Sequence, residues 1–425
     1  MSRNSGFWAI VRRESARMLS RPLYGLSMVC APLFCFIFFT TLMREGLPES
    51  LPAGVVDEDN STVSRSILRN LDSYQQTEII RQYANFAEAR EAMQRNEIYG
   101  FFYIPKGTEL KASSQQQPVI SIYTNATYLI PSSLLYRDMK TMAVMAAAAA
   151  GREVLFAKGA NMDQAMGFLQ PIRMDMHALG NPWLNYNVYL SNTMLPAVLV
   201  LMVLMVTCFS IHTELKDGTA GEWLAMADDN ILKAVSAKLF PQTMLFLLMA
   251  LIYIVLLYGY LEFPAHNGFW PMMLAAGLLI LASQGFAVFI ASAIPSLRWS
   301  LSLCTLWGVL SIPISGFSFP VMGMPEALQA MSYMFPLRYY FLIYVDQALN
   351  GIPMVFSAWF YTALIVFLIL PLVDISLLRK AAHGRISATK DGAYQLTLKI
   401  FKREGLDVRQ TMMKEAWELL NNVTF

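Results

Sequence analysis

Six apolar segments, each close to the length of a helix that crosses a lipid bilayer, constrain this chain more than any other feature. A helix needs about 20 apolar residues to cross, and inside the bilayer its backbone polar groups must bond to one another. The sequence therefore predicts a polytopic α-helical membrane protein with six transmembrane helices. The predicted spans are residues 23–43, 188–211, 239–260, 270–294, 300–316 and 355–378.

The amino-acid composition supports this class. The chain is 56% hydrophobic and 15% charged, whereas about 25% of the residues in a soluble domain are charged. Its net charge of +2 gives no indication of a nucleic-acid partner. The first apolar segment, 23–43, is too long for the hydrophobic region of a secretory signal peptide, which has about 7–15 residues. We therefore expect it to be retained as the first span.

Lysine and arginine residues predict the orientation of the spans. Residues 1–22 contain five arginines and residues 379–425 contain nine Lys and Arg, whereas the loop 262–269 has none. Because short cytoplasmic loops are enriched in these residues, both termini are expected in the cytoplasm. The leader 1–22 is expected to form an interfacial (elbow) helix, although Glu14 falls on its apolar side. The cytoplasmic tail 379–425 is assigned no role.

The long segment 44–187, between the first two spans, is predicted to be an α/β domain on the extracytoplasmic side. Four strands are predicted at 53–57, 77–83, 98–104 and 119–123. Ser61 and Asn85 are placed to cap two helices between them, and a long helix is expected over 132–156. The 13 Lys and Arg of 44–182 do not argue against this side, because long domains translocate largely regardless of charge.

The sequence contains no motif for catalysis, nucleotide binding or metal binding. It lacks the Gly-x-x-x-x-Gly-Lys-Ser/Thr phosphate loop, so we expect neither ATP binding nor an enzyme activity on this chain. Its four cysteines lie inside apolar runs, which favours buried side chains over disulfides or zinc, and its four histidines lie far apart. No catalytic residue, metal site or bound cofactor is therefore predicted.

The loop between the second and third spans, residues 212–232, carries the most specific pattern. Gly218 suits the end of the preceding helix, where a positive φ is often required. Thr219 and Glu222 have the spacing of a capping box, which predicts a short helix beginning there. Trp223 then begins a group of large apolar residues on the cytoplasmic side. This pattern predicts docking against a soluble partner; the alternative is a helix that rests on lipid headgroups.

On these residues the chain resembles the permeases of ABC-2-type transporters, in the subgroup with a large extracytoplasmic domain after the first span. The loop is similar to the family's acidic–basic–Gly-Thr-x-x-Glu-x-Leu signature. The matching residues are Glu214, Lys216, Gly218, Thr219, Glu222 and Leu224. Further similar positions are Glu14, Arg17, Pro22, Pro32 and the segments 55–61, 181–186, 315–320, 324–326 and 336–339. The family's Leu-rich run and proline are absent at 225–230, so the docking helix is expected to end early.

The resemblance implies the permease subunit of an ATP-driven exporter in the bacterial inner membrane. ATP and Mg²⁺ would bind a separate ATP-binding subunit. The motion of that subunit would reach the spans through Glu214, Lys216, Gly218, Thr219, Glu222, Trp223 and Leu224. A second permease copy, identical or different, would meet this one along the second and fifth spans. A periplasmic adaptor and an outer-membrane channel are further partners that the sequence leaves open.

Polar residues on the second and fifth spans are candidates for lining the transport path. They are Asn187, Asn192, Thr193, Ser302 and Thr305. The alternative for the Ser and Thr hydroxyls is a hydrogen bond to their own helix backbone. Asp374, near the cytoplasmic end of the last span, is expected to pair with Arg379 or Lys380, because an unpaired charge in a span is costly.

The proline-broken segment 317–350 is predicted to enter the outer leaflet as short helices and to form an outer gate. The gate candidates are Pro336, Arg338, Tyr339 and Asp346. Because a charge at such depth normally has a partner, Arg338 and Asp346 are predicted to pair.

The substrate and the mode of action stay open between three alternatives. An exporter could move a hydrophobic or amphipathic compound, drug-like or lipid, out of the cytoplasm or the inner leaflet. A relative within the same family could export polysaccharide or lipid instead. The third alternative is a non-transporting, membrane-anchored receptor or assembly factor that acts through residues 44–187.

Overall fold

The computed structural model describes residues 6–114, 116–172, 175, 177 and 180–382. The chain divides into two compact units, and each is described by itself. The span unit comprises Met1–Leu42, Leu179–Asn181 and Val188–Phe425, and the α/β unit comprises Met43–Ala178 and Pro182–Asn187. The predicted tail lies outside the described residues beyond residue 382.

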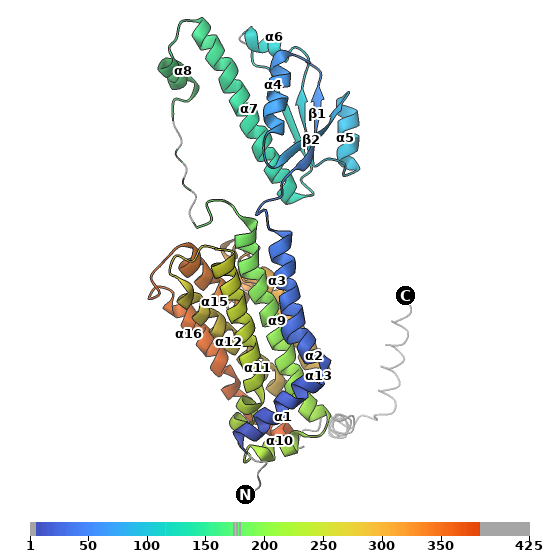
Figure 1. Ribbon diagram of the computed structural model, residues 1–425, viewed down its shortest axis with the longest axis vertical. Helices are drawn as coiled ribbons and strands as arrows, with labels where there is room; N and C mark the ends of the chain where they lie inside the picture. The colour runs from blue at the N-terminus through green and yellow to red at the C-terminus, as the bar shows by residue number, and fades with distance from the viewer. Residues whose placement is uncertain (1–5, 115, 173–174, 176, 178–179, 383–425) are drawn as a thin grey trace, which may run out of the picture. The chain divides into compact units, whose positions relative to one another are not determined.

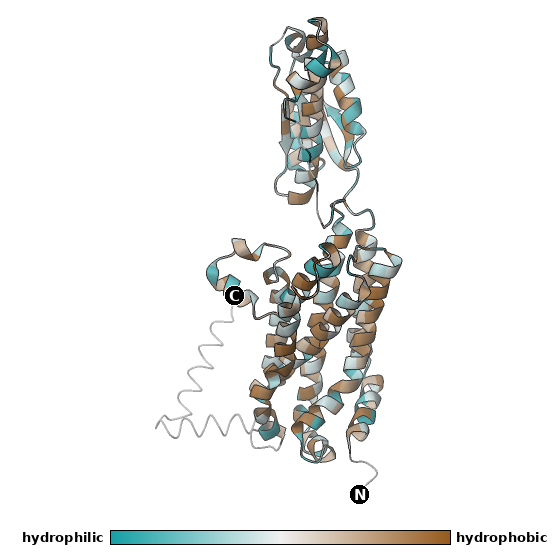
Figure 2. Ribbon diagram, turned by 90° about the vertical axis from the view of Figure 1, so that its left-hand side faces the viewer, coloured by the Kyte–Doolittle hydropathy of each residue, from teal (hydrophilic) through white to brown (hydrophobic). Residues whose placement is uncertain are grey.

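Within the described residues, the span unit contains six helices that are long and apolar enough to cross a membrane. They are Pro22–Leu42 (α2, a π-helical turn and α3), Tyr186–Lys216 (α9), Ile231–Tyr260 (α11 and η2), Phe269–Ala293 (α12), Leu297–Ile314 (α13) and Ala358–Ala382 (α16, η5 and α17) (Figure 1). Each of the six predicted segments overlaps one of these helices, so the predicted number of spans is confirmed. Figure 2 shows hydrophobic residues along most of their length.

Helices α9 and α12 form the centre of the span unit. In each, 67% of the most apolar window is buried, against 11% for the first span. Gly285 explains how closely α12 packs on α16: a Cβ atom there would lie 2.5 Å from the carbonyl oxygen of Phe367. Side chains from both helices, including Leu279 and Leu364, belong to one buried apolar cluster. The arrangement leaves the first span mostly uncovered by the rest of the chain.

Shorter helices lie beside the spans. The leader forms a helix at Phe7–Ser20 (α1), as predicted, and the loop after α9 forms Ala220–Met226 (α10). These two helices lie together at one end of the span unit (Figure 1). The broken segment after α13 forms Val321–Gly323 (η3), Glu326–Ser332 (α14), Pro336–Tyr344 (α15) and the π-helical turn Val345–Leu349 (η4). The prediction of several short helices in this segment is therefore confirmed.

The α/β unit contains one four-stranded sheet. Its strands are Leu51–Asp57 (β1), Thr77–Tyr83 (β2), Gly100–Ile104 (β3) and Ser121–Thr124 (β4). The order is β2-β1-β3-β4, with β1 parallel to both neighbours and β4 antiparallel to β3. Alternate residues of β1 face opposite sides: Val55 packs in the cluster with α7, and Val56 in the cluster with α5. All four predicted strands are confirmed: β2 has the predicted bounds, and the other three differ at one or both ends.

The helices of the α/β unit are Thr62–Asp72 (α4), Phe86–Gln94 (α5), Thr108–Ser113 (α6), Leu129–Ala157 (α7) and Met162–Leu169 (α8). Helices α4, α5 and α8 begin at side-chain caps, whereas α6 and α7 have none. Ser61 caps α4 and Asn85 caps α5, each accepting a hydrogen bond from a backbone N–H three residues on, as predicted. Helices α6 and α8 were not predicted. Asp59 holds α6 by accepting hydrogen bonds from the N–H groups of Gly107 and Thr108, across a sequence distance that no local pattern covers.

Candidate functional site

A buried group of charges joins three helices at the end of the span unit where α1 and α10 lie. Glu14 of α1, Glu214 near the end of α9 and Lys238 of α11 have side chains at most 2% exposed. The Nζ atom of Lys238 lies 2.6 Å from Oε2 of Glu14 and 2.9 Å from Oε1 of Glu214. One ammonium group therefore pairs with two carboxylates from separate helices.

Two arginines of α1 complete the cluster. Arg13 Nη2 lies 2.5 Å from Oε2 of Glu214, and Arg17 donates a hydrogen bond to Oε1 of the same carboxylate. Burial alone would lower the pKa of Arg17, but the hydrogen bond and negative charge of Glu214 outweigh it, so that pKa is raised and the group stays charged. The charge cluster, as we call Glu14, Arg13, Arg17, Glu214 and Lys238, thus holds three cations against two carboxylates.

Uncharged side chains satisfy the remaining oxygens of the charge cluster. The hydroxyl of Ser210 donates to Glu14 Oε1 over 2.9 Å, and Gln242 donates to Ser210 over 2.8 Å. The hydroxyl of Thr219 donates to Glu214 Oε2. Removing one partner of a buried ion pair costs about 3–5 kcal/mol, because the other charge is left uncompensated. The cluster therefore fixes α1, the end of α9 and the start of α11 to one another.

The turn before α10 differs from the prediction in one respect. Helix α10 begins directly after Thr219, and Gly218 has the expected positive φ, of 71°. The predicted capping box is wrong: the Thr219 side chain makes no cap hydrogen bond, because its hydroxyl is taken by the buried carboxylate of Glu214. Helix α10 ends at Met226, in agreement with the expected early end.

The large apolar residues of α10 face inward. Trp223 is 0% exposed, and its indole Nε1–H donates to the carbonyl of Ala234 in α11 over 3.1 Å. Leu224 is buried beside it in the same apolar cluster. We expected Trp223 to be an apolar anchor for a partner, but its side chain anchors α10 to its own chain. The exposed residues of this turn and helix are Lys216, Asp217, Gly218, Gly221, Glu222 and Ala225.

The gate candidates lie together on α15 and η4, but the predicted ion pair does not form. The guanidinium of Arg338 lies over the ring of Tyr333, 5.1 Å from its centroid. Asp346 instead accepts a hydrogen bond from the hydroxyl of Ser357 over 2.8 Å. Eight residues turn an α-helix through about 800°, which leaves the two side chains about 80° apart. The π-helical turn that begins at Val345 changes this angle further.

The other two gate candidates support α15 itself. Pro336 is the first residue of α15, where its missing N–H costs no helical hydrogen bond. The hydroxyl of Tyr339 donates to the carbonyl of Tyr333 over 2.9 Å and so closes the turn between α14 and α15.

Most of the path candidates are engaged within their own chain. Asn192 is buried, donates to the Val188 carbonyl and accepts from the Tyr258 hydroxyl, each over 2.8 Å. Thr193 and Thr305 bond to their own helix backbone, which is the alternative that the sequence left open. Of the two remaining candidates, Asn187 is buried and Ser302 is exposed.

The expected pairing of Asp374 is also wrong. Arg379 pairs with Asp229, which follows α10, and not with Asp374. Within the described residues, both carboxylate oxygens of Asp374 are buried and have no hydrogen-bond partner. Asp374 lies between η5, Leu370–Val373, and α17, whereas Arg379 lies further along α17, which contacts α10.

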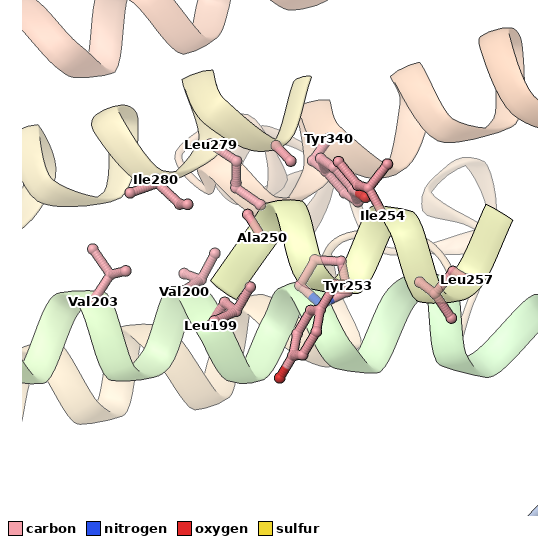
Figure 3. A pocket seen from close by; sticks show the side chains of 12 residues that line it. Leu199, Val200, Val203, Ala250, Tyr253, Ile254, Leu257, Leu279, Ile280 and Tyr340 are labelled. Atoms are coloured by element: carbon pink, nitrogen blue, oxygen red, sulfur yellow. The ribbon is translucent and has the colours of Figure 1, made fainter. Parts of the chain in front are cut away.

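An apolar pocket lies between α9, α11, α12 and α15. Figure 3 shows Leu199, Val203, Ile254, Leu279 and Tyr340 around it. Tyr253 also lines the pocket, but its hydroxyl points away and donates to the carbonyl of Pro32. The cavity measures about 20 Å³, which is close to the space of a single water molecule. It is too small to hold a substrate in this conformation.

Sequence reasoning did not find Lys238, Ser210 or Gln242 as members of the site. One signal for the charge cluster was present, since Glu14 stands on the apolar side of the leader helix. A carboxylate on the face that a helix buries requires a cation from the element packed against it. The identity of that cation depends on which helices meet, which the sequence pattern does not reveal.

In the part of the span unit that the structure describes, six helices of span length define a polytopic membrane protein. In the described part of the chain, no group of three or more His, Cys, Asp or Glu side chains could hold a metal ion. The family model described as ABC-2 family transporter protein matches residues 24–375. The chain therefore belongs to the ABC-2 family of transporter proteins. No curated protein sequence matched it.

Proposed function

We propose that this chain is the permease subunit of an ATP-driven exporter, with ATP and Mg²⁺ bound by a separate ATP-binding subunit. Two permease copies would pair, and both termini would lie on the cytoplasmic side of the bacterial inner membrane. The α/β unit would then lie outside, since it is inserted after the first span. The transported compound would be hydrophobic or amphipathic.

The observation that carries this proposal is the charge cluster. Lys238 links α11 to Glu14 of α1 and to Glu214 of α9, and Thr219 links the turn before α10 to Glu214. A force applied to the exposed face of α10 is therefore transmitted to α1, α9 and α11 together, through a contiguous network of buried contacts. This is the mechanical link that a permease needs when ATP is hydrolysed on another chain.

The exposed face of α10 offers a direct test. Ala225 is exposed there, so Ala225→Arg adds a long charged side chain to the proposed docking surface without entering the core. Ala148→Arg is the matched control, because Ala148 is an exposed alanine of helix α7 in the α/β unit. We expect Ala225→Arg to lose the ATP-binding subunit during purification in mild detergent, with normal membrane insertion, and Ala148→Arg to retain it.

Two results would count against the proposal. If the unmodified chain brings down no subunit with a phosphate-loop ATPase, the chain does not work as proposed. If Ala225→Arg retains the ATPase subunit as well as Ala148→Arg does, the docking surface lies elsewhere.

A further inference from the structure

Among the residues that the structure describes, Arg338 has no ionic partner. It lies in α15, in the segment that the proposed topology places at the outer half of the spans. Residues 315–357 contain two acidic side chains, Glu326 and Asp346. Glu326 is exposed at the start of α14, and Asp346 accepts a hydrogen bond from Ser357. Within the described residues, neither forms an ion pair with Arg338, and the Nε atom of Arg338 is buried without a hydrogen-bond partner.

The packing of α15 shows that Arg338 stands at the level of the spans. Phe335, directly before α15, stacks on Trp307 of α13 with ring centroids 4.9 Å apart. Trp307 lies seven residues before the end of α13 at Ile314, or about 10 Å along the helix. At the other end of α15, the turn η4 contacts the loop between the third and fourth spans. There the N–H of His266 donates to the carbonyl of Ala348. Helix α15 thus runs from beside the middle of α13 towards that loop.

The guanidinium of Arg338 is partly covered by its neighbours. The Tyr333 ring covers one side of it, and Gly316 lies on another: a Cβ atom at Gly316 would be 3.5 Å from Nη1 of Arg338. Gly316 has a φ of 104°, which disfavours any other residue there. Arg338 is partly exposed, so an outside group can reach it although its Nε is covered.

A charge at membrane depth is retained when it faces a partner, water or a functional ligand. A guanidinium presents paired N–H donors that fit the two oxygens of a phosphate or carboxylate. From this geometry we infer that Arg338 binds the anionic group, phosphate or carboxylate, of an amphipathic molecule. The source of that group is either a lipid of the outer leaflet or the compound that the permease moves. The second source rests on the proposed transport function, and the first does not.

The first arm of the test uses the full chain in nanodiscs and needs no ATP-binding subunit. The discs contain equal amounts of phosphatidylglycerol and phosphatidylcholine, and native mass spectrometry measures which lipid stays bound. We expect the unmodified chain to retain phosphatidylglycerol preferentially. Arg338→Gln and Arg338→Met should reduce that preference about tenfold, since a hydrogen bond to a charged group contributes at least this much. Arg298→Gln is the control, because Arg298 is an exposed arginine at the opposite end of α13.

The second arm uses the complex with its ATP-binding subunit in discs of phosphatidylcholine alone. Dodecyl phosphate and dodecyltrimethylammonium serve as anionic and cationic probes, and the rate of ATP hydrolysis is measured. A response to the anionic probe that disappears in Arg338→Gln assigns the site to the transported compound. Phosphatidylglycerol retention in the first arm without that response assigns it to membrane lipid.

The inference is overturned if the unmodified chain shows neither a preference for phosphatidylglycerol nor a response to dodecyl phosphate. It is also overturned if Arg338→Met keeps the phosphatidylglycerol preference and the response to dodecyl phosphate at the level of Arg298→Gln. A complex that hydrolyses no ATP would contradict the proposed function and leave the first arm as the deciding measurement.

Discussion

Replacing Lys238 by methionine should strongly destabilise the span unit. The contacts of Lys238 predict which second substitution should restore part of the lost stability. Lys238 is 1% exposed and lies within 3 Å of both Glu14 and Glu214. Methionine keeps the length and apolar character of the stem but removes the charge. Loss of one partner from a buried ion pair costs about 3–5 kcal/mol, so we expect a fall of that size in the free energy of unfolding.

The loss of the Lys238 charge should be more unfavourable for Glu14 than for Glu214. Glu214 keeps Arg13 at 2.5 Å and its bond to Arg17. Glu14 keeps only Arg17 at 3.7 Å among the cations of the cluster. Most of the cost therefore lies at Glu14, and the double variant Lys238→Met with Glu14→Gln should recover roughly half or more of it. Pairing Lys238→Met with Glu214→Gln should recover less, because Arg13 and Arg17 would then lose their own partner.

Equilibrium unfolding of the full chain in mixed detergent micelles, followed by far-ultraviolet circular dichroism as dodecyl sulfate is added, measures these differences. The coupling between each pair of substitutions follows from the double-mutant cycle. A Lys238→Met variant within about 1 kcal/mol of the unmodified chain would refute the reasoning, because removal of one partner from a buried ion pair leaves the other charge uncompensated. Better rescue by Glu214→Gln than by Glu14→Gln would refute the assignment of the cost to Glu14.

Two further predictions concern other parts of the chain. Trp223→Ala should lower the free energy of unfolding by about 3–5 kcal/mol, as expected for a fully buried tryptophan, whereas Glu222→Ala on the exposed face should change it by less than about 0.5 kcal/mol in the same titration. Asp59 should make α6 sensitive to acid. Slight burial raises the pKa of Asp59, but hydrogen bonds from Ser61 and from the N–H groups of Glu109, Gly107 and Thr108 lower it below its ordinary 3.8. A lowered folded-state pKa stabilises the fold above the unfolded-state pKa, and this contribution is lost as pH falls through the folded-state value. Hydrogen exchange at 107–113, corrected for intrinsic rates, should therefore show loss of protection below about pH 4. The variant Asp59→Asn should have weaker protection at neutral pH and a flatter pH dependence. An unchanged pH profile in Asp59→Asn would contradict this prediction.

Features that depend on neighbouring residues were predictable from the sequence. An apolar run of about 20 residues strongly favours a membrane-spanning helix, and this accounts for the six helices of span length in the described residues. The caps at Ser61 and Asn85 use a backbone N–H three residues away, so their pattern is complete within one turn.

Features that depend on distant contacts were not predictable. Lys238 and Glu14 are 224 positions apart, and a lysine at the start of a span resembles one that reaches back to the headgroups. The capping box at Thr219 failed because a buried carboxylate competes for the hydroxyl. The pairing of Arg338 with Asp346 treated eight residues as two full turns, although they exceed two turns by about 80°, and the π-helical turn at Val345 changes the angle further.

The most direct test of the central claim is the rate of ATP hydrolysis by the ATP-binding subunit in proteoliposomes, with and without this chain. The account predicts a rate that changes several-fold when the chain is present. Ala225→Arg should return the rate to that of the ATP-binding subunit alone, and Ala148→Arg should not. Equal rates with the chain, without it and with Ala225→Arg would contradict the claim that α10 and the charge cluster couple this permease to ATP hydrolysis.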